Sequence, residues 1–167
     1  MKKKIELRFI DEFIDDYNGF IERLDEFDNQ HQPKEFLERF SGEDQESPDA
    51  ICILGKAKFI AIEQANAVSQ LEMRGALPKR NISEPYDSSP VISEIINVIK
   101  DKSTKDYGGK NVSEVWLLLT GVTFIFIDVL EKRLRKEHIS TKFNRIFLHR
   151  GTSHSICELT GLMKRSK

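Results

Sequence analysis

Two isoleucine-rich segments separated by three residues most strongly limit how this chain folds. Residues 50–54 (Ala-Ile-Cys-Ile-Leu) and 58–64 (Lys-Phe-Ile-Ala-Ile-Glu-Gln) have the composition of β-strands, and the intervening Gly-Lys-Ala is typical of a tight hairpin turn. Because both strands are mostly apolar, rather than apolar only at alternate positions, we expect the hairpin to lie in the centre of a sheet that is covered on both faces.

Other segments predict helices and strands around this hairpin. Apolar residues recur every three or four positions from Phe9 to Phe27, with acidic residues on the opposite face, which predicts a long amphipathic helix. The same reasoning predicts helices over 34–40, from Val91 to the lysines before Gly108, and over 122–137, strands over 115–120, 145–149 and 155–159, and a loop over 70–90, which contains three prolines. This order predicts an α/β fold with a mixed central sheet flanked by helices.

The length of the chain, 167 residues, predicts a single domain. Within it we distinguish N-terminal helices (1–45), a hairpin-helix-strand core (48–120) and a C-terminal helix with strands (121–167). No apolar run approaches the roughly 20 residues that span a bilayer, and charged residues follow the basic start where a secretory signal needs an apolar stretch. We therefore expect a cytoplasmic protein without a membrane segment.

The two cysteines lie far apart, inside segments that resemble strands. Cys52 and Cys157 are separated by 105 positions. This spacing favours small buried apolar side chains over a disulfide framework or a zinc site.

Charge is distributed unevenly along the chain, although its net charge is only −1. Residues 1–49 carry 7 basic and 15 acidic side chains, whereas residues 132–167 carry 10 basic and 2 acidic ones. One explanation is intramolecular, with the acidic first helix packed beside the basic C-terminal segment. The other is functional, with Lys132, Arg133, Arg135 and Lys136 contacting the phosphates of DNA.

Two carboxylates flank the hairpin. Asp49 enters its first strand and Glu63 lies near the end of its second, so antiparallel pairing brings them to the same end of the hairpin. Paired carboxylates repel each other unless a proton or a cation lies between them, and Mg²⁺ is commonly held by one or two carboxylates and several waters. The spacing is equally consistent with a structural role, in which Asp49 caps the loop and Glu63 pairs with a neighbouring lysine.

Together these segments resemble the restriction-endonuclease-like fold of the PD-(D/E)XK nuclease superfamily. The resemblance is carried by Pro48-Asp49, by Ile62-Glu63, by the segment Ile99-Lys100-Asp101-Lys102-Ser103-Thr104-Lys105-Asp106-Tyr107 and by the strand Trp116-Leu117-Leu118-Leu119, and it covers roughly residues 8–120. It implies an α-β-β-β-α-β core, two metal-binding acids (Asp49 and Glu63), Mg²⁺ or Mn²⁺ as the cofactor, and a lysine that positions the attacking water.

The chain departs from this family at one catalytic position. The family places lysine two residues after the second acid, where this chain has Ala65. Some members supply the lysine from the following helix, which makes Lys102 and Lys105 the candidates here. A glutamate from the first helix often joins such sites, and Glu22 and Glu38 are the candidates for that role.

These observations lead to two alternative functions. The first is a metal-dependent nuclease, or nuclease-derived domain, that acts on DNA phosphodiesters. The second, motivated by Ala65, is a catalytically inactive nuclease-like module that binds a nucleic acid or a protein partner.

Overall fold

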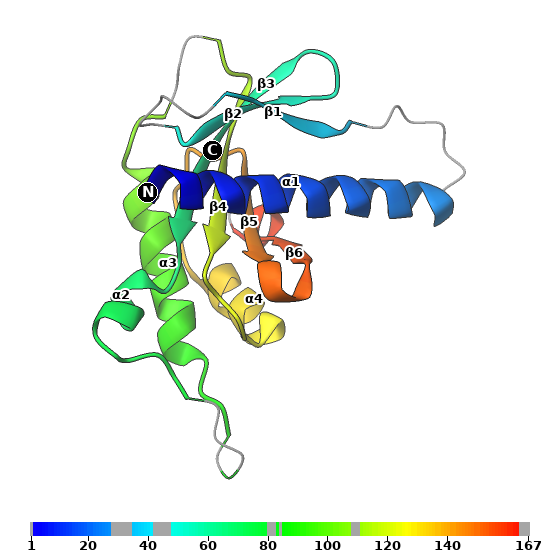
Figure 1. Cartoon of the computed structure of the whole chain (residues 1–167). Coiled ribbons are helices and arrows are strands. Elements are labelled where there is room, and N and C mark those ends of the chain that lie inside the picture. Colours follow the sequence, from blue (N-terminus) through cyan, green and yellow to red (C-terminus); the bar gives the residue numbers. More distant parts are fainter. Residues whose placement is uncertain are drawn as a thin grey trace.

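A computed structural model describes residues 2–27, 35–41, 48–79, 83, 85–107 and 111–163. Within these residues, six strands form one sheet in the order β1-β2-β3-β4-β5-β6 (Figure 1). The strands are β1 (Leu37–Ser41), β2 (Ala50–Leu54), β3 (Lys58–Asn66), β4 (Glu114–Thr120), β5 (Arg145–Arg150) and β6 (Ser155–Glu158). The helices are α1 (Lys2–Phe27), α2 (Ser69–Met73), α3 (Ser89–Ser103) and α4 (Ile127–Lys136), with short 3₁₀ turns η1 (Gly151–Ser153) and η2 (Thr160–Leu162).

The sheet is mixed, as the sequence predicts. Strands β1, β2 and β3 pair antiparallel, β3, β4 and β5 pair parallel, and β6 pairs antiparallel with β5. The predicted hairpin is confirmed, because Leu54 pairs with Lys58 and Ala50 pairs with Ile62 around the turn at Gly55. Parallel strands need crossover connections, and α3 and α4 lie in the two connections here.

Helices cover both faces of the sheet, which explains why the central strands are apolar at consecutive positions. On one face, α1 packs residues such as Ile10, Phe13 and Tyr17 against Trp116 and Phe147. On the opposite face, α3 and α4 pack their apolar sides in a second core, which contains Ile95, Ile99, Leu130, Leu134, Leu117 and Leu119. The α/β architecture with a flanked mixed sheet is therefore present.

The predicted helix over residues 34–40 is wrong. Residues 37–41 form the edge strand β1, in which Leu37 is buried and Glu38 and Phe40 are exposed. This alternation has the period of a strand, and pairing with β2 satisfies the backbone of this segment. The proposed start of that helix at Pro33 lies outside the described residues.

The predicted helix over residues 122–137 begins later than expected. Gly121 has a left-handed φ of +87°, and the chain then runs without helix until α4 begins at Ile127. The rings of Phe124 and Phe126 pack against Tyr86 in this stretch. Aromatic packing of this segment and its β-branched residues (Val122 and Thr123) account for the extended conformation.

Helix α1 begins at Lys2, seven residues before the predicted start at Phe9, and the short helix α2 (Ser69–Met73) lies at the start of the predicted 70–90 loop, whereas the remaining helices and strands lie close to their predicted positions. Helix α3 ends at Ser103, and the predicted stop at Gly108 lies outside the described residues. None of the helices in the described ranges combines the length and the apolar character that a membrane crossing requires. Both cysteines are free thiols, and burial raises the pKa of Cys52 to about 12, which agrees with an apolar packing role.

Candidate functional site

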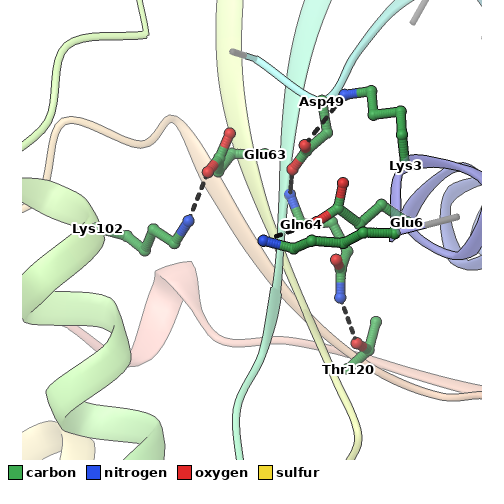
Figure 2. Close-up of polar contacts among 8 residues, drawn as sticks. Lys3, Glu6, Asp49, Glu63, Gln64, Lys102 and Thr120 are labelled. Atoms are coloured by element: carbon green, nitrogen blue, oxygen red, sulfur yellow. Dashed lines mark hydrogen bonds and ion pairs between the residues drawn. The ribbon is translucent and has the colours of Figure 1, made fainter. Parts of the chain in front are cut away.

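The register of the hairpin brings Asp49 and Glu63 to the same region of the sheet. Asp49 directly precedes β2, and Ala50 pairs with Ile62 on β3, one residue before Glu63. The Asp49 carboxylate accepts a hydrogen bond from the backbone N–H of Gln64, with an N to Oδ2 distance of 2.8 Å (Figure 2). Both carboxylates are buried, with 6% of each residue exposed.

Lys102 approaches Glu63 from the opposite side of the site. Its Nζ donates a hydrogen bond to Glu63 Oε1 at 2.6 Å, so α3 contributes a cation to an acid on β3 (Figure 2). Helix α3 packs against the sheet through Ile95 and Ile99, and this packing directs the next turns of the helix toward Glu63. The resemblance leads us to expect a lysine from the helix that follows the hairpin. Lys102 lies on that helix and contacts the second acid, Glu63.

Lys105 lies past the end of α3 and is exposed. Its positive charge lowers the pKa of Glu63, although less than the hydrogen bond from Lys102 does. Lys105 therefore contributes to the electrostatic field of the site. Ala65, where the family has lysine, is buried in the core beneath α3.

Opposing effects act on Glu63. Burial raises the pKa of its carboxyl above the ordinary value, and the negative charge of Asp49 raises this pKa further, while Lys102 lowers it through a hydrogen bond and through its charge. Burial is the largest of these effects, because desolvation disfavours the charged form of a carboxyl. A second cation near Glu63 would favour the ionised form.

Two buried polar atoms beside these residues have no hydrogen-bond partner in the described part of the chain: Glu63 Oε2 and the hydroxyl of Tyr107. Burial and the negative charge of Glu63 both raise the pKa of Tyr107, and a weak hydrogen-bond interaction with Glu63 raises this pKa further, so the phenol lies close to that carboxylate without forming a well-made hydrogen bond to it. A buried carboxylate oxygen without a donor is an available ligand for a cation or a water.

The site also contains residues that the sequence analysis did not select. Lys3 on α1 lies 3.2 Å from Asp49 (Nζ to Oδ1), and Gln64 Nε2 donates a hydrogen bond to Thr120 Oγ1 at 2.6 Å (Figure 2). Glu6, one turn along from Lys3, lines the cleft that Gln64 also lines. From the sequence alone, the lysines at the start of the chain are considered only as part of a possible secretion signal. The contact of Lys3 with Asp49 depends on how α1 lies across the sheet, which the sequence pattern does not specify.

Neither of the glutamates proposed to join the site lies there. Glu22 follows Lys3 by 19 positions on α1, which corresponds to about 29 Å along a helix. Glu38 is exposed on the edge strand β1, opposite Ile53. Among residues of α1, Glu6 is the acid that lines the neighbouring cleft.

The donors at this site are carboxylate oxygens, which are the protein ligands that Mg²⁺ takes. The residues that the structure describes contain no group of three or more His, Cys, Asp and Glu side chains placed to hold a metal. Two carboxylates, one with an unpartnered oxygen, suit an ion that keeps most of its waters and needs few protein ligands. The residues that would hold Mg²⁺ are therefore Asp49 and Glu63.

A cleft of about 670 Å³ opens next to these acids. It lies between the first turns of α1, the end of β3, α2 and one side of α3. Gln64 and Lys102 line the cleft and also contact Asp49 and Glu63, so the cleft adjoins the two acids, although neither acid lines it.

The four basic residues proposed to contact DNA lie on α4 and are all exposed: Lys132, Arg133, Arg135 and Lys136. The same helix packs on the sheet through Leu130 and Leu134. The acidic first helix packs beside β5 and β6 of the basic C-terminal segment, where Tyr17 contacts Arg145, but α4 with its four basic residues packs on the opposite face of the sheet. Acidic residues of α1 instead contact Arg39 and His149, through Asp11 and Asp16.

No family model, curated protein or solved structure matches this chain.

Proposed function

We propose that this chain is a metal-dependent nuclease, or a nuclease-derived domain, that acts on DNA phosphodiesters in the cytoplasm. The observation that carries the proposal is the meeting of Asp49, Glu63 and Lys102, which come from the start of β2, from β3 and from α3. The chain order α1, β1, β2, β3, α2, α3 and β4 supports the proposal, because it differs from the α-β-β-β-α-β order that the resemblance implies only by the short helix α2.

In this proposal each residue has a separate task. A Mg²⁺ or Mn²⁺ ion held by Asp49 and Glu63 would supply a water of lowered pKa and neutralise charge on the phosphate. Lys102 donates hydrogen bonds from a position against Glu63, so its ammonium group orients a water or a phosphate oxygen beside that carboxylate. The hydrogen bond from the Gln64 backbone fixes the rotamer of Asp49.

Hydrolysis of plasmid DNA tests this proposal. We expect the purified chain to nick or degrade a plasmid in the presence of Mg²⁺ or Mn²⁺, and we expect Glu63→Ala to abolish this activity. Glu38→Ala is a matched control, because Glu38 is exposed on the edge strand away from the site. Cleavage that persists in the Glu63→Ala variant would contradict the site assignment.

The alternative function is a catalytically inactive module that binds nucleic acid or a protein partner. Two observations favour it: residue 65 is alanine, and each acid is already paired with a lysine, Asp49 with Lys3 and Glu63 with Lys102. Titration calorimetry with Mn²⁺ separates the two functions. Metal binding that Asp49→Asn removes supports the nuclease, whereas the inactive module should show no such binding.

A further inference from the structure

The cleft beside the two acids has a composition that suits a nucleobase. It is lined by the amides of Asn97 and Gln70 and by the apolar side chains of Phe9, Ile5 and Val98. The side-chain amides of Asn97 and Gln70 make no hydrogen bond to any residue in the described ranges, and both residues are exposed at the cleft, so their donors and acceptors are accessible to a ligand. Side-chain amides form paired hydrogen bonds with base edges, and aromatic rings stack on bases.

The charge of the same cleft does not suit a nucleic-acid backbone. Glu6, Glu94 and Asp101 line it, whereas its basic residues are Lys2 and Lys102. Lys2 is engaged with Glu6 at 3.7 Å and Lys102 with Glu63 at 2.6 Å. Phosphates would be repelled from the interior and attracted to the end where Lys102 lies.

The size of the cleft matches one nucleotide. Its volume of about 670 Å³ falls in the range of small-molecule sites, about 300–1,000 Å³, which has room for a single base but does not enclose a base-paired helix. A base inside the cleft would place its own phosphate near Lys102 and the two acids, because Gln64 and Lys102 belong to both the cleft and the acidic site.

We propose that this cleft binds an unpaired nucleotide, so that the preferred substrate is single-stranded DNA or a strand end rather than an intact duplex. This inference rests on the proposed function, since it names the substrate class of the same site. The base lies against Phe9 and is bound by the amide of Asn97, and the phosphate lies at the Lys102 end.

Fluorescence anisotropy tests this inference. A labelled single-stranded oligonucleotide and a blunt duplex of the same sequence are titrated with the protein in EDTA, so that hydrolysis does not interfere. We expect tighter binding of the single strand. We expect Asn97→Ala and Phe9→Leu each to weaken that binding about fivefold or more, and Phe9→Leu keeps an apolar side chain so that folding is preserved.

Asn111→Ala is the matched control, because Asn111 is an exposed amide that does not line the cleft. Its single-strand affinity should equal that of the parent chain. Equal or tighter binding of the duplex would overturn the inference, and so would unchanged single-strand affinity in both cleft variants.

Separate outcomes test the cleft and the hydrolase activity. Preferential single-strand binding that depends on Asn97, without hydrolysis in Mg²⁺ or Mn²⁺, would support the cleft and overturn the nuclease. Hydrolysis that depends on Glu63 but proceeds equally on duplex and single strand, with both cleft variants unaffected, would overturn the inference that the cleft binds an unpaired nucleotide and leave the nuclease proposal standing.

Discussion

Lys102 and Glu63 are 39 positions apart in the sequence, yet their side chains meet at 2.6 Å between α3 and β3. The contact joins a half-buried cation to a carboxylate that is almost fully removed from water. The contact therefore influences the pH at which Glu63 ionises.

Metal binding at this site should increase with pH. Burial raises the pKa of Glu63, so the carboxylate that a metal needs forms at a higher pH than in an exposed glutamate. Lys102 lowers this pKa, and Lys102→Met should therefore move the midpoint of Mn²⁺ binding to higher pH. Calorimetry across a pH series measures the midpoint, with Lys100→Met, on the exposed side of α3, as the control that should leave it unchanged.

The Glu63 carboxyl should make the metal-free chain less stable as pH rises, whereas metal binding should increase with pH. Because its pKa is higher in the folded chain than in the unfolded chain, folding favours the protonated form. Without metal, the free energy of unfolding should decrease as pH rises from the ordinary glutamate pKa through the raised one. Urea denaturation should show that Glu63→Gln removes this decrease, and an identical pH profile in the variant would contradict the assignment.

Tyr107→Phe should leave the stability of the metal-free chain unchanged or slightly increased. The Tyr107 hydroxyl is buried and has no well-formed hydrogen bond among the described residues, and its interaction with Glu63 is the smallest of the effects on its pKa, so its removal costs little and relieves a desolvated polar group. Tyr17→Phe is the comparison, because the Tyr17 hydroxyl accepts a hydrogen bond from Arg145 at 3.2 Å. Removal of that hydroxyl should cost about 1 kcal/mol in urea denaturation, and an equal cost in the Tyr107 variant would show that the phenol has a partner.

Asp16→Ala should destabilise the fold more than His154→Ala does. Asp16 contacts His149 at 2.7 Å and His154 at 3.2 Å, but His149 is 1% exposed whereas His154 is largely exposed. Removal of Asp16 leaves a buried imidazole nitrogen without this partner, a cost of about 1–3 kcal/mol. Removal of the exposed His154 side chain should cost less than about 1 kcal/mol, and thermal unfolding distinguishes the two.

Substitution of two glycines by alanine should change the free energy of unfolding in opposite directions. Gly121 has a left-handed φ of +87°, and a Cβ there would collide with the side chain of Asn66. Gly121→Ala should therefore destabilise by at least about 1 kcal/mol. Gly19 lies within α1 with open space around it, and Gly19→Ala should stabilise by about 0.5–1 kcal/mol. Urea denaturation measures both, and similar effects would refute the conformational explanation.

The basic residues of α4 should control the salt dependence of any DNA binding. Replacement of Lys132, Arg133, Arg135 and Lys136 by glutamine should reduce the slope of log affinity against log salt by about 0.7–0.9 for each phosphate that these side chains neutralise in the parent chain. An unchanged slope and affinity would exclude α4 from the DNA interface. Arg133 also contacts Glu137 at 3.8 Å, so thermal unfolding of the fourfold variant should accompany the titration.

The helices and strands that the sequence predicts well are those whose apolar periodicity and turn residues all lie within one short segment. The hairpin is an example, because 15 consecutive residues contain both strands and the glycine of the turn, which has a φ of +63°. Strand β1 is wrongly predicted as a helix because its five residues allow either periodicity, and its pairing with β2 determines which one forms.

The candidate site is also predictable only where its residues belong to a local pattern or to the family resemblance. Asp49 and Glu63 follow from hairpin register, and Lys102 follows from the family resemblance. Lys3 and Glu6 do not follow from either, because their positions depend on the angle at which α1 crosses the sheet. That angle results from tertiary packing of Phe13 and Tyr17, which no local pattern specifies.

Helix α1 connects strands from both halves of the sheet. Asn18 exchanges two hydrogen bonds with the backbone of Leu37 on β1, while Tyr17 contacts Arg145 on β5. Separation of either half would remove part of the surface on which α1 packs. The backbone amides of buried residues such as Ile10 and Phe13 should therefore exchange with deuterium only when the whole sheet opens, so the antiparallel and parallel halves unfold as one cooperative unit.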